Sequence, residues 1–278
     1  MASALRRAKI APRLYPHDRS EPILSLDGVT VRFNGTAALE DVSFTLQTGE
    51  RVAVVGPNGA GKSTLFNVIA GVLTPQRGEV RVYGYAPRGH ICIAYVPQRN
   101  QVDWRFPVNV ADVVMMGRVG KLGPFRWPRR ADWEVVHRAL ELVDMSHLAK
   151  RQIGELSGGQ QQRVFIARAL AQEAELMLMD EPFTGLDVKS QEDIFTILER
   201  LRRRGVTVLV ATHDLNIAAE RFDRLMLLNR QIIGMGRADD VFTPELLGRA
   251  YGGHLRMIHT EQGTMILSDT CCGEGHDP

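Results

Sequence analysis

Three short segments of the sequence carry residue types that could bind and cleave a phosphate anhydride. The first, "GPNGAGKST" at residues 56–64, fits the pattern G-x-x-x-x-G-K-[ST] and directly follows an apolar run expected to be a strand. Its glycines would let backbone N–H groups surround the phosphates, while Lys62 would reach the β- and γ-phosphates and Ser63 would ligate Mg²⁺. An ordinary glycine-rich turn requires neither the lysine nor the serine. The segment therefore predicts an ATP site, completed by Gly56, Pro57, Asn58, Gly59, Ala60, Gly61 and Thr64.

The second segment, "LMLMDEP" at residues 176–182, places two carboxylates at the end of an apolar strand. Asp180 is expected to hold Mg²⁺, directly or through water, and Glu181 to orient or deprotonate the attacking water. The alternative is a surface turn that begins with two acidic residues. His213 follows another strand, "VTVLVAT", and could contact the γ-phosphate at the same sheet edge. An isolated histidine at such a position is more often a loop residue.

The third segment, "ELSGGQQQR" at residues 155–163, has the residues of a second anion site at a helix start. Ser157 and Gln160 alone also fit a capping box, which needs no ligand. Two consecutive glycines, Gly158 and Gly159, are unfavourable in a first turn unless another group must approach the backbone closely. We therefore expect a phosphate at this site as well.

The elements that must position these segments alternate between strand and helix. Short apolar runs at 23–33, around 43–47 and at 51–55 are broken by Gly28, Gly35 and Gly49, which indicates strands. Trp133, Val136, Leu140 and Val143 lie on one face of a helix expected at 131–145, which favours core packing. Further elements are expected as helices at 64–72, 158–172 and 190–204, strands at 176–180 and 206–212, and a hairpin at 224–236. The pattern predicts an α/β fold with a parallel sheet covered on both faces.

Composition narrows the class of protein. A chain of 278 residues with net charge +2 has no large charge excess for nucleic acid, so we expect no nucleic-acid partner. Three cysteines form no disulfide framework, and no apolar run has the roughly 20 residues of a membrane span, so we expect a reducing cytoplasm and a membrane role only through a partner. Residues 1–22 are expected to be a flexible basic tail, with contact to anionic lipid as the alternative.

The three segments together resemble the motifs of the ATP-binding cassette (ABC) ATPases. Residues 56–64 are similar to the Walker A loop of that family, 156–160 ("LSGGQ") to its signature, and 179–181 to its Walker B strand with the catalytic glutamate. Gln98 matches the Q-loop, Asp187 the D-loop and His213 the switch histidine, all in the order of the family. The resemblance implies a parallel P-loop core sheet, an antiparallel β subdomain and an inserted α-helical subdomain.

This resemblance also implies roles for individual residues. Two cassettes would pair head to tail as a homodimer, so that Ser157, Gly158, Gly159 and Gln160 of one chain face the ATP of the other. Ser63, Gln98 and Asp180 would hold Mg²⁺, while Glu181, His213, Gln98 and Asp187 would serve catalysis. Phe33 matches a position where the family stacks an aromatic ring, usually tyrosine, on adenine; a core phenylalanine is the alternative. The implied domains are an ABC ATPase domain at 23–245, its helical subdomain at about 100–165, and a C-terminal extension at 246–278 whose end is disordered.

The segment "VPQRNQVDWRFPVNVADVVMMGR" at 96–118 is similar to that of bacterial manganese and zinc importers. This likeness implies a separate integral membrane permease, an indirect extracytoplasmic metal-binding partner, and a peripheral position on the cytoplasmic face of the cell membrane. We expect the permease to dock near Gln98 to Arg118, where Trp104, Phe106 and Pro107 form an apolar cluster; packing of the helical subdomain is the alternative. "GLD" at 185–187 stands where these importers often have "GVD".

Other functions keep the same ATP motifs. An importer of another small solute, such as an iron chelate, and a non-transport cassette that drives a membrane signalling partner both stay open. The C-terminal "CCGEGHDP" contains Cys271, Cys272, Glu274, His276 and Asp277, but adjacent cysteines lack the spacing of structural zinc sites, so a disordered end is expected instead.

Overall fold

The computed structural model describes residues 20–87, 92–99, 102–122 and 126–252, and the backbone of 255–260 and 263–268. The predictions for the N-terminal basic tail and for the C-terminal Cys/His segment therefore lie outside the described residues. Within the described part, no helix combines the length and the apolar character of a membrane span.

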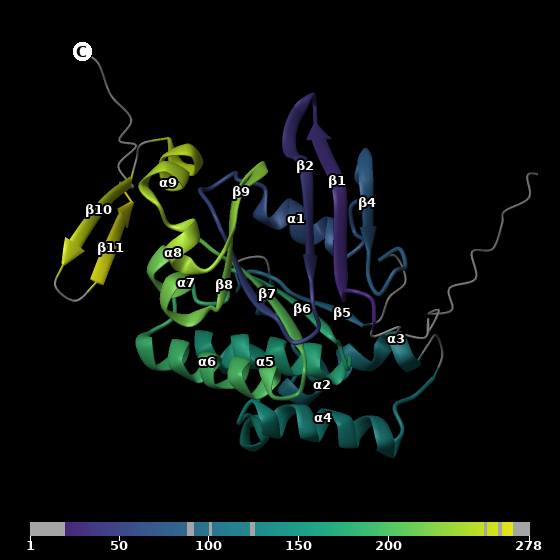
Figure 1. Ribbon diagram of the computed structural model, residues 1–278. Coiled ribbons are helices and arrows are strands. Elements are labelled where there is room, and N and C mark those ends of the chain that lie inside the picture. The colour runs from purple at the N-terminus through teal and green to yellow at the C-terminus, as the bar shows by residue number, and fades with distance from the viewer. Residues whose placement is uncertain are drawn as a thin grey trace, which may run out of the picture.

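A six-stranded sheet forms the centre of the fold and carries strands in the order β5-β6-β7-β3-β8-β9 (Figure 1). The pairings from β5 to β8 are parallel, whereas β9 is antiparallel to β8 at one edge. The predicted parallel sheet and the predicted hairpin at 224–236 are thus confirmed. The strands are β5 Ile93–Val96, β6 Leu176–Asp180, β7 Thr207–Thr212, β3 Arg51–Val55, β8 Arg224–Asn229 and β9 Gln231–Gly236.

A second, antiparallel sheet has the order β2-β1-β4, with β1 at Leu24–Phe33, β2 at Thr36–Leu46 and β4 at Arg77–Arg81. The expectation that Gly28 ends a strand is wrong. Gly28 adopts φ 58° inside β1, where the pairing with β2 shifts register between Leu26 and Val29. A glycine tolerates this left-handed conformation without a side-chain clash, so the strand bulges and continues.

On the side of the central sheet away from the antiparallel sheet, helices cover the strands and extend below them (Figure 1). The predicted helices at 64–72, 158–172 and 190–204 are present with their boundaries shifted by up to three residues. The helices are α1 Lys62–Ile69, α2 Val110–Met115, α3 Val119–Leu122, α4 Arg130–Leu142, α5 Gly158–Ala171, α6 Val188–Arg202, α7 Leu215–Arg221, α8 Ala238–Val241 and α9 Pro244–Tyr251. Short 3₁₀ turns lie at Met116–Arg118, Ser146–Leu148 and Ile153–Glu155, and a hairpin of β10 Leu255–Thr260 and β11 Gly263–Ser268 follows α9.

Alternation along the central strands fills two hydrophobic cores. Val52 and Val54 of β3 pack into the core shared with α1 and the antiparallel sheet, whereas Ala53 and Val55 face the core shared with α2, α4, α5 and α6. Since successive side chains of a strand point to opposite faces, a strand covered on both sides must be apolar throughout. The uninterrupted apolar runs of the sequence therefore mark the strands in the middle of the molecule.

Trp133 corrects the prediction for α4. Val136, Leu140 and Val143 are fully buried, but Trp133 keeps 36% of its surface exposed, and its ring lies 6.4 Å from that of His137. The helix begins at Arg130, so Trp133 lies in its first turn. Helical periodicity predicts which residues share a face, but it does not predict how far along the helix the covering elements extend.

The apolar cluster after Gln98 divides into a packed and an exposed part. Trp104 lies edge-on to Phe165 of α5, with ring centroids 5.3 Å apart, and donates a hydrogen bond to the carbonyl oxygen of Arg99 at 2.9 Å. Phe106, in contrast, is 60% exposed, and Pro107 is exposed as well. The packing alternative therefore holds for Trp104 and not for Phe106.

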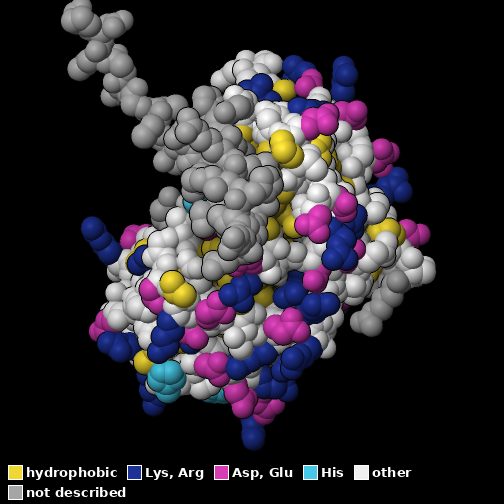
Figure 2. Space-filling view, turned by 60° about the vertical axis from the view of Figure 1, so that its left-hand side comes forward, with side chains coloured by type: hydrophobic (Ala, Val, Ile, Leu, Met, Phe, Trp, Pro, Cys, Tyr) yellow, Lys and Arg dark blue, Asp and Glu magenta, His cyan; other side chains and the backbone are white. Residues whose placement is uncertain are grey.

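Arg118 ties the helices below the sheet together. Its guanidinium is buried and donates to Asp132 of α4 at 3.2 Å, to the carbonyl oxygen of Ala171 at 3.0 Å and to Glu173 at 2.7 Å. On the molecular surface, Lys and Arg side chains alternate with Asp and Glu over the lower half of the face in Figure 2, with no extended field of one sign. This mixture agrees with the small net charge of the sequence.

Candidate functional site

The carboxyl ends of four neighbouring parallel strands bring the predicted ATP residues to one edge of the central sheet. The glycine-rich loop follows β3, Gln98 follows β5, Asp180 and Glu181 end β6, and His213 follows β7. These residues surround one cavity of about 530 Å³. It is lined by Ala38, Asn58, Gly59, Ala60, Gly61, Lys62, Ser63, Thr64, Gln98, Asp180, Glu181 and His213.

Close backbone packing fixes the shape of the glycine-rich loop. A Cβ on Gly56 would lie 2.0 Å from the carbonyl oxygen of Leu228, and one on Gly61, at φ 97°, would lie 2.4 Å from that of Ala38. The turn of the β8–β9 hairpin holds the same loop, because the N–H of Arg230 donates to the carbonyl oxygen of Ala60 at 2.8 Å. Ala38 and this turn are parts of the site that no sequence pattern indicated.

Lys62 lies inside the loop that it is expected to serve. Its ammonium is buried and donates to the carbonyl oxygens of Gly56 at 2.6 Å and Pro57 at 3.1 Å. Burial lowers the pKa of Lys62 below its usual 10.5, although the charges of Glu181 and Asp180 oppose the shift. Two carboxylates therefore face this cation across the cavity.

Asp180 is almost fully buried, so the surface-turn alternative is wrong. Burial raises the pKa of its carboxyl above the ordinary 3.8, while hydrogen bonds from Ser63 and Tyr95 lower it in part. The Tyr95 hydroxyl donates to Asp180 at 3.2 Å. Tyr95 belongs to β5, whose sequence shows only a general apolar pattern, so no motif marks this residue.

Glu181 and His213 form a close pair at the mouth of the cavity. The Nδ1 of His213 lies 2.7 Å from the Glu181 carboxylate, to which the Thr184 hydroxyl also donates, at 2.9 Å. Burial raises the pKa of Glu181, but the hydrogen bonds and charges of its neighbours, His213 first, bring it below the ordinary 4.5. Glu181 also has φ 48°, a strained conformation for a residue with a side chain, and such strain is concentrated at functional sites.

The second anion segment lies outside this cavity. The capping box is present, because Gln160 N–H donates to the Ser157 hydroxyl at 3.4 Å and Ser157 N–H donates to Gln160 at 3.0 Å. The glycines have a reason within the chain: a Cβ on Gly158 would lie 2.9 Å from the Arg99 guanidinium. One on Gly159 would lie 2.4 Å from the Ser190 hydroxyl. The expected close approach to the backbone is thus present, and the phosphate expected at this segment stays a prediction.

Asp187 and Phe33 also lie apart from the cavity lining. Asp187 caps α6, accepting from the N–H of Ser190 at 2.9 Å and from its hydroxyl at 2.8 Å. Phe33 is 51% exposed at the end of β1, so the alternative of a core phenylalanine is wrong. Its ring face is free to meet a planar group, as the adenine prediction requires.

The chain matches a known family over more than half of its length. The family described as "ABC transporter" matches residues 39–184. The manganese transport system ATP-binding protein MntB of Bacillus subtilis is 44% identical over 254 residues, which cover 91% of this chain and 98% of that protein. The chelated iron transport system membrane protein YfeB of Yersinia pestis is 46% identical over 262 residues, covering 92% and 86%. The solved ADP conformation of an ATP-binding cassette of an ABC transporter aligns with a TM-score of 0.74 at 29% identity, covering 84% and 99%.

The close pair predicts a measurable shift in the titration of His213. Its hydrogen bond to Glu181 raises the pKa of His213 above the ordinary 6.5, against the opposing effect of burial. In NMR titrations, the His213 ring should titrate above 6.5 in the wild type and at a lower pH in Glu181→Gln. Equal titration in both proteins would contradict the pairing.

The same pair gives the pH dependence of stability a definite sign. The contribution of His213 is complete below 6.5 and is lost as pH rises through its raised pKa. The contribution of Glu181 to the free energy of unfolding is present above 4.5 and is lost as pH falls through the lowered pKa of this residue. The difference in unfolding free energy between wild type and Glu181→Gln should therefore be largest between these two values and smaller on either side.

Proposed function

The chain belongs to the ABC transporter family as an ATP-binding cassette ATPase, and on this basis we propose that it powers the import of a divalent metal ion through a separate membrane permease. One observation supports the ATPase part of the proposal. A single cavity at the carboxyl ends of the parallel strands is lined by Lys62, Asp180, Glu181 and His213. The metal part rests on the docking segment and on the names of the relatives.

The donor set on the cavity wall suits Mg²⁺. Ser63 supplies a hydroxyl oxygen, Gln98 an amide oxygen and Asp180 a carboxylate, and Mg²⁺ prefers such hard oxygen ligands together with phosphate. When bound, Mg²⁺ would neutralise charge that develops on the phosphates. Burial favours the protonated form of Asp180, which binds metal poorly. The hydrogen bonds from Ser63 and Tyr95 favour the ionised form that a metal requires.

The remaining residues of the cavity would divide the work of hydrolysis. Lys62 would move from the loop carbonyls to the β- and γ-phosphates, because a phosphate oxygen offers this cation a charged acceptor. Glu181 would accept a proton from the attacking water, and its lowered pKa keeps it ionised for that step. His213 would hold the Glu181 carboxylate in place and face the γ-phosphate.

A homodimer would complete each ATP site. Ser157 is exposed at the first turn of α5 and does not line the cavity of its own chain. Two-fold pairing of one chain gives two identical composite sites, in which the Ser157–Gln160 segment of one protomer would close on the phosphates of the other. Phe33 would stack on adenine.

The permease would dock at the exposed part of the segment from Gln98 to Arg118. Phe106 presents an exposed ring there, and Gln98 of the ATP cavity begins the same segment eight residues earlier, so one short segment would link docking to the nucleotide state. The chain would thus lie on the cytoplasmic face of a bacterial membrane, and an extracytoplasmic metal-binding protein would deliver the cargo to the permease.

Manganese is the first cargo that we propose, with zinc second. The name of the Bacillus subtilis relative supports manganese, whereas that of the Yersinia pestis relative supports an iron chelate as the alternative. Selection among metals requires ligands in fixed geometry around the transported ion. No group of three or more His, Cys, Asp or Glu side chains within the described part of the chain could hold a metal, so we place the selectivity in the partner chains.

The role of Glu181 is tested by Glu181→Gln. A positioned general base contributes about 10²–10⁴-fold, so steady ATPase activity should fall by a factor in that range while ATP binding persists. Glu134→Gln, an exposed change on α4 away from the ATP cavity, should leave both unchanged. Near-normal turnover of Glu181→Gln would mean that another group, with His213 the next candidate, is the base.

Shared ATP sites are tested by mixing two inactive chains. Lys62→Ala removes the phosphate-binding cation, and Ser157→Arg blocks the exposed signature serine without the packing clash that a side chain at Gly159 would create. Random pairing leaves one intact site in half of the dimers, so about one quarter of wild-type ATPase activity should return. Absence of recovery, despite mixed dimers demonstrated by tag capture, would argue against composite sites.

Docking and cargo are tested together with Phe106→Asp. A buried apolar anchor contributes roughly 2 kcal/mol or more to binding, so permease capture and radioactive manganese uptake by cells should collapse while the free chain still binds ATP. Val72→Asp, at an apolar position that is 78% exposed just beyond α1, is the matched control and should retain uptake. If Lys62→Ala leaves manganese and zinc uptake untouched, the import proposal is wrong and the non-transport alternative takes its place.

A further inference from the structure

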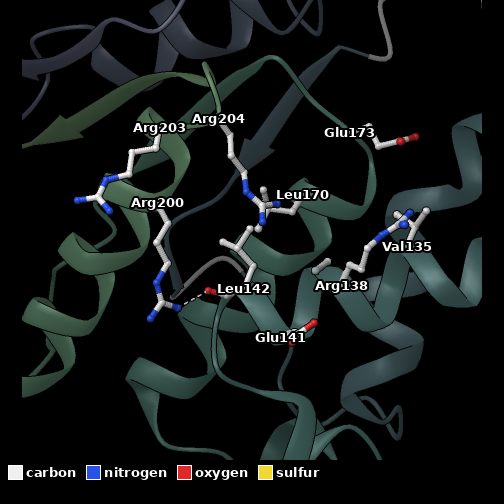
Figure 3. A pocket seen from close by; sticks show the side chains of 10 residues that line it. Val135, Arg138, Glu141, Leu142, Leu170, Glu173, Arg200, Arg203 and Arg204 are labelled. Carbon is white, nitrogen blue, oxygen red and sulfur yellow. Dashed lines mark hydrogen bonds between the residues drawn. The ribbon is translucent and has the colours of Figure 1, made fainter.

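We propose that a second cavity, between α4 and the ends of α5 and α6, binds a small phosphate-bearing metabolite with an apolar or aromatic part (Figure 3). The cavity has a volume of about 670 Å³, within the range of small-molecule sites, and shares no lining residue with the ATP cavity. It is therefore a separate candidate site, and the proposal does not depend on which cargo the transporter carries.

Two exposed arginines of this cavity form no ion pair with a described residue. Arg138 of α4 and Arg204, just beyond α6, line the cavity, and neither has an ion pair or a side-chain hydrogen bond among the described residues. Arg200 is engaged, since it donates to the carbonyl oxygen of Leu142 at 2.7 Å and to Asp144 at 2.8 Å. Arg203 points away from the other side chains in Figure 3 and pairs with Glu199 at 3.6 Å.

The carboxylates of the cavity do not balance these charges. Glu173 accepts from Arg118 at 2.7 Å and from Lys121, so its charge is already committed to another pair of cations. Glu141 is the other carboxylate among the described residues that line the cavity, and no ion pair joins it to Arg138 or Arg204. Guanidinium groups bind phosphate oxygens in a bidentate manner, so an anion of this class fits the surplus positive charge.

The floor of the cavity is apolar. Ala139 and Leu142 of α4 are buried, while Val135 and Leu170 are partly buried and pack against the same core. A ligand that carried only charge would gain nothing from this floor, whereas a ring or short apolar group would be removed from water there. The combination of arginines above an apolar floor is the reason to propose a phosphate ester and not inorganic phosphate alone.

Interaction with the helix dipole explains only part of the arginine cluster. Arg200 and Arg204 lie at the carboxyl end of α6, where cations are stabilised without any ligand. Arg138 lies in the middle of α4, on a different helix, and has no such reason to face this cavity. Its presence opposite Arg204 is what distinguishes the cavity from an ordinary helix end.

The position of the cavity would couple it to the ATP site. α5 begins with the signature segment and ends beside the cavity at Leu170, while α6 begins at the Asp187 cap and ends at the cavity arginines. Their first turns are in contact, since Gly159 packs against Ser190. A ligand in this cavity would contact α5 at Leu170 and α6 at Arg204, at the ends opposite to the proposed ATP-facing segments, so it should restrain both helices and lower the ATPase rate.

The test is equilibrium binding of labelled AMP and of pyrophosphate to the full chain, with Lys62→Ala present in every protein used for binding, because this change removes the phosphate-binding cation of the ATP cavity. We expect AMP to bind more tightly than pyrophosphate, and the double variant Arg138→Gln/Arg204→Gln to weaken AMP binding by roughly tenfold or more. The matched control is Arg130→Gln/Arg202→Gln, which removes one arginine from each of the same helices outside the cavity and should bind as wild type. Thermal unfolding of all three proteins checks that they are folded.

Several outcomes would overturn the proposal. No AMP binding at about 1 mM, or equal binding by the double variant, would show that the cavity is not a phosphate-ester site. If hexaglutamate peptide or phosphatidylglycerol vesicles bind in an Arg138- and Arg204-dependent manner and AMP does not, the occupant is an acidic protein segment or a lipid headgroup instead. The coupling is tested on the ATPase rate of proteins that keep Lys62. If AMP binds but lowers the rate of the wild type no more than that of Arg138→Gln/Arg204→Gln, the coupling is refuted.

Discussion

The parallel pairing of β5, β6, β7 and β3 is the constraint on which the site depends. Parallel strands that are neighbours in a sheet present their carboxyl ends at one edge, whatever their separation in the chain. Here that edge collects the glycine-rich loop, Gln98, two carboxylates and His213 from segments spread over about 160 residues. The apolar side chains of these strands fill the two cores, so stability and the geometry of the site come from the same residues.

The second organising interaction is the balance of buried charge inside the cavity. Lys62 and Asp180 each lose favourable hydration through burial. The pKa of Lys62 is therefore lowered and that of Asp180 is raised, and both shifts favour the neutral form. Their proximity and the hydrogen bonds around them offset this loss. Glu181 is held by His213 and Thr184 in a strained backbone conformation. Such a set of closely placed charges is well suited to receive a polyanion with its cation.

α5 and α6 connect this edge of the molecule with the helical layer. The close contact of Gly159 with Ser190, which itself donates to the Asp187 cap, fixes the two first turns relative to each other. At their other ends the helices meet α4, partly through the buried Arg118 network. These contacts connect the first turns of α5 and α6 with the arginine-lined cavity through two continuous helices.

The sequence by itself determined the central strands β3, β6 and β7, the glycine-rich loop, the carboxylate pair and the hairpin, because these rest on local rules: alternation, turn chemistry and fixed spacing within one segment. Tertiary structure decided what local rules cannot reach. It exposed Phe106 while burying much of Trp104, left Trp133 at the edge of its helix, and gave Gly159 a packing partner within its own chain. It also brought Arg138 and Arg204 to one cavity from positions far apart in the chain. The physical reason is that burial and charge pairing depend on which distant segments pack together. The local sequence pattern of one segment does not specify its packing partners.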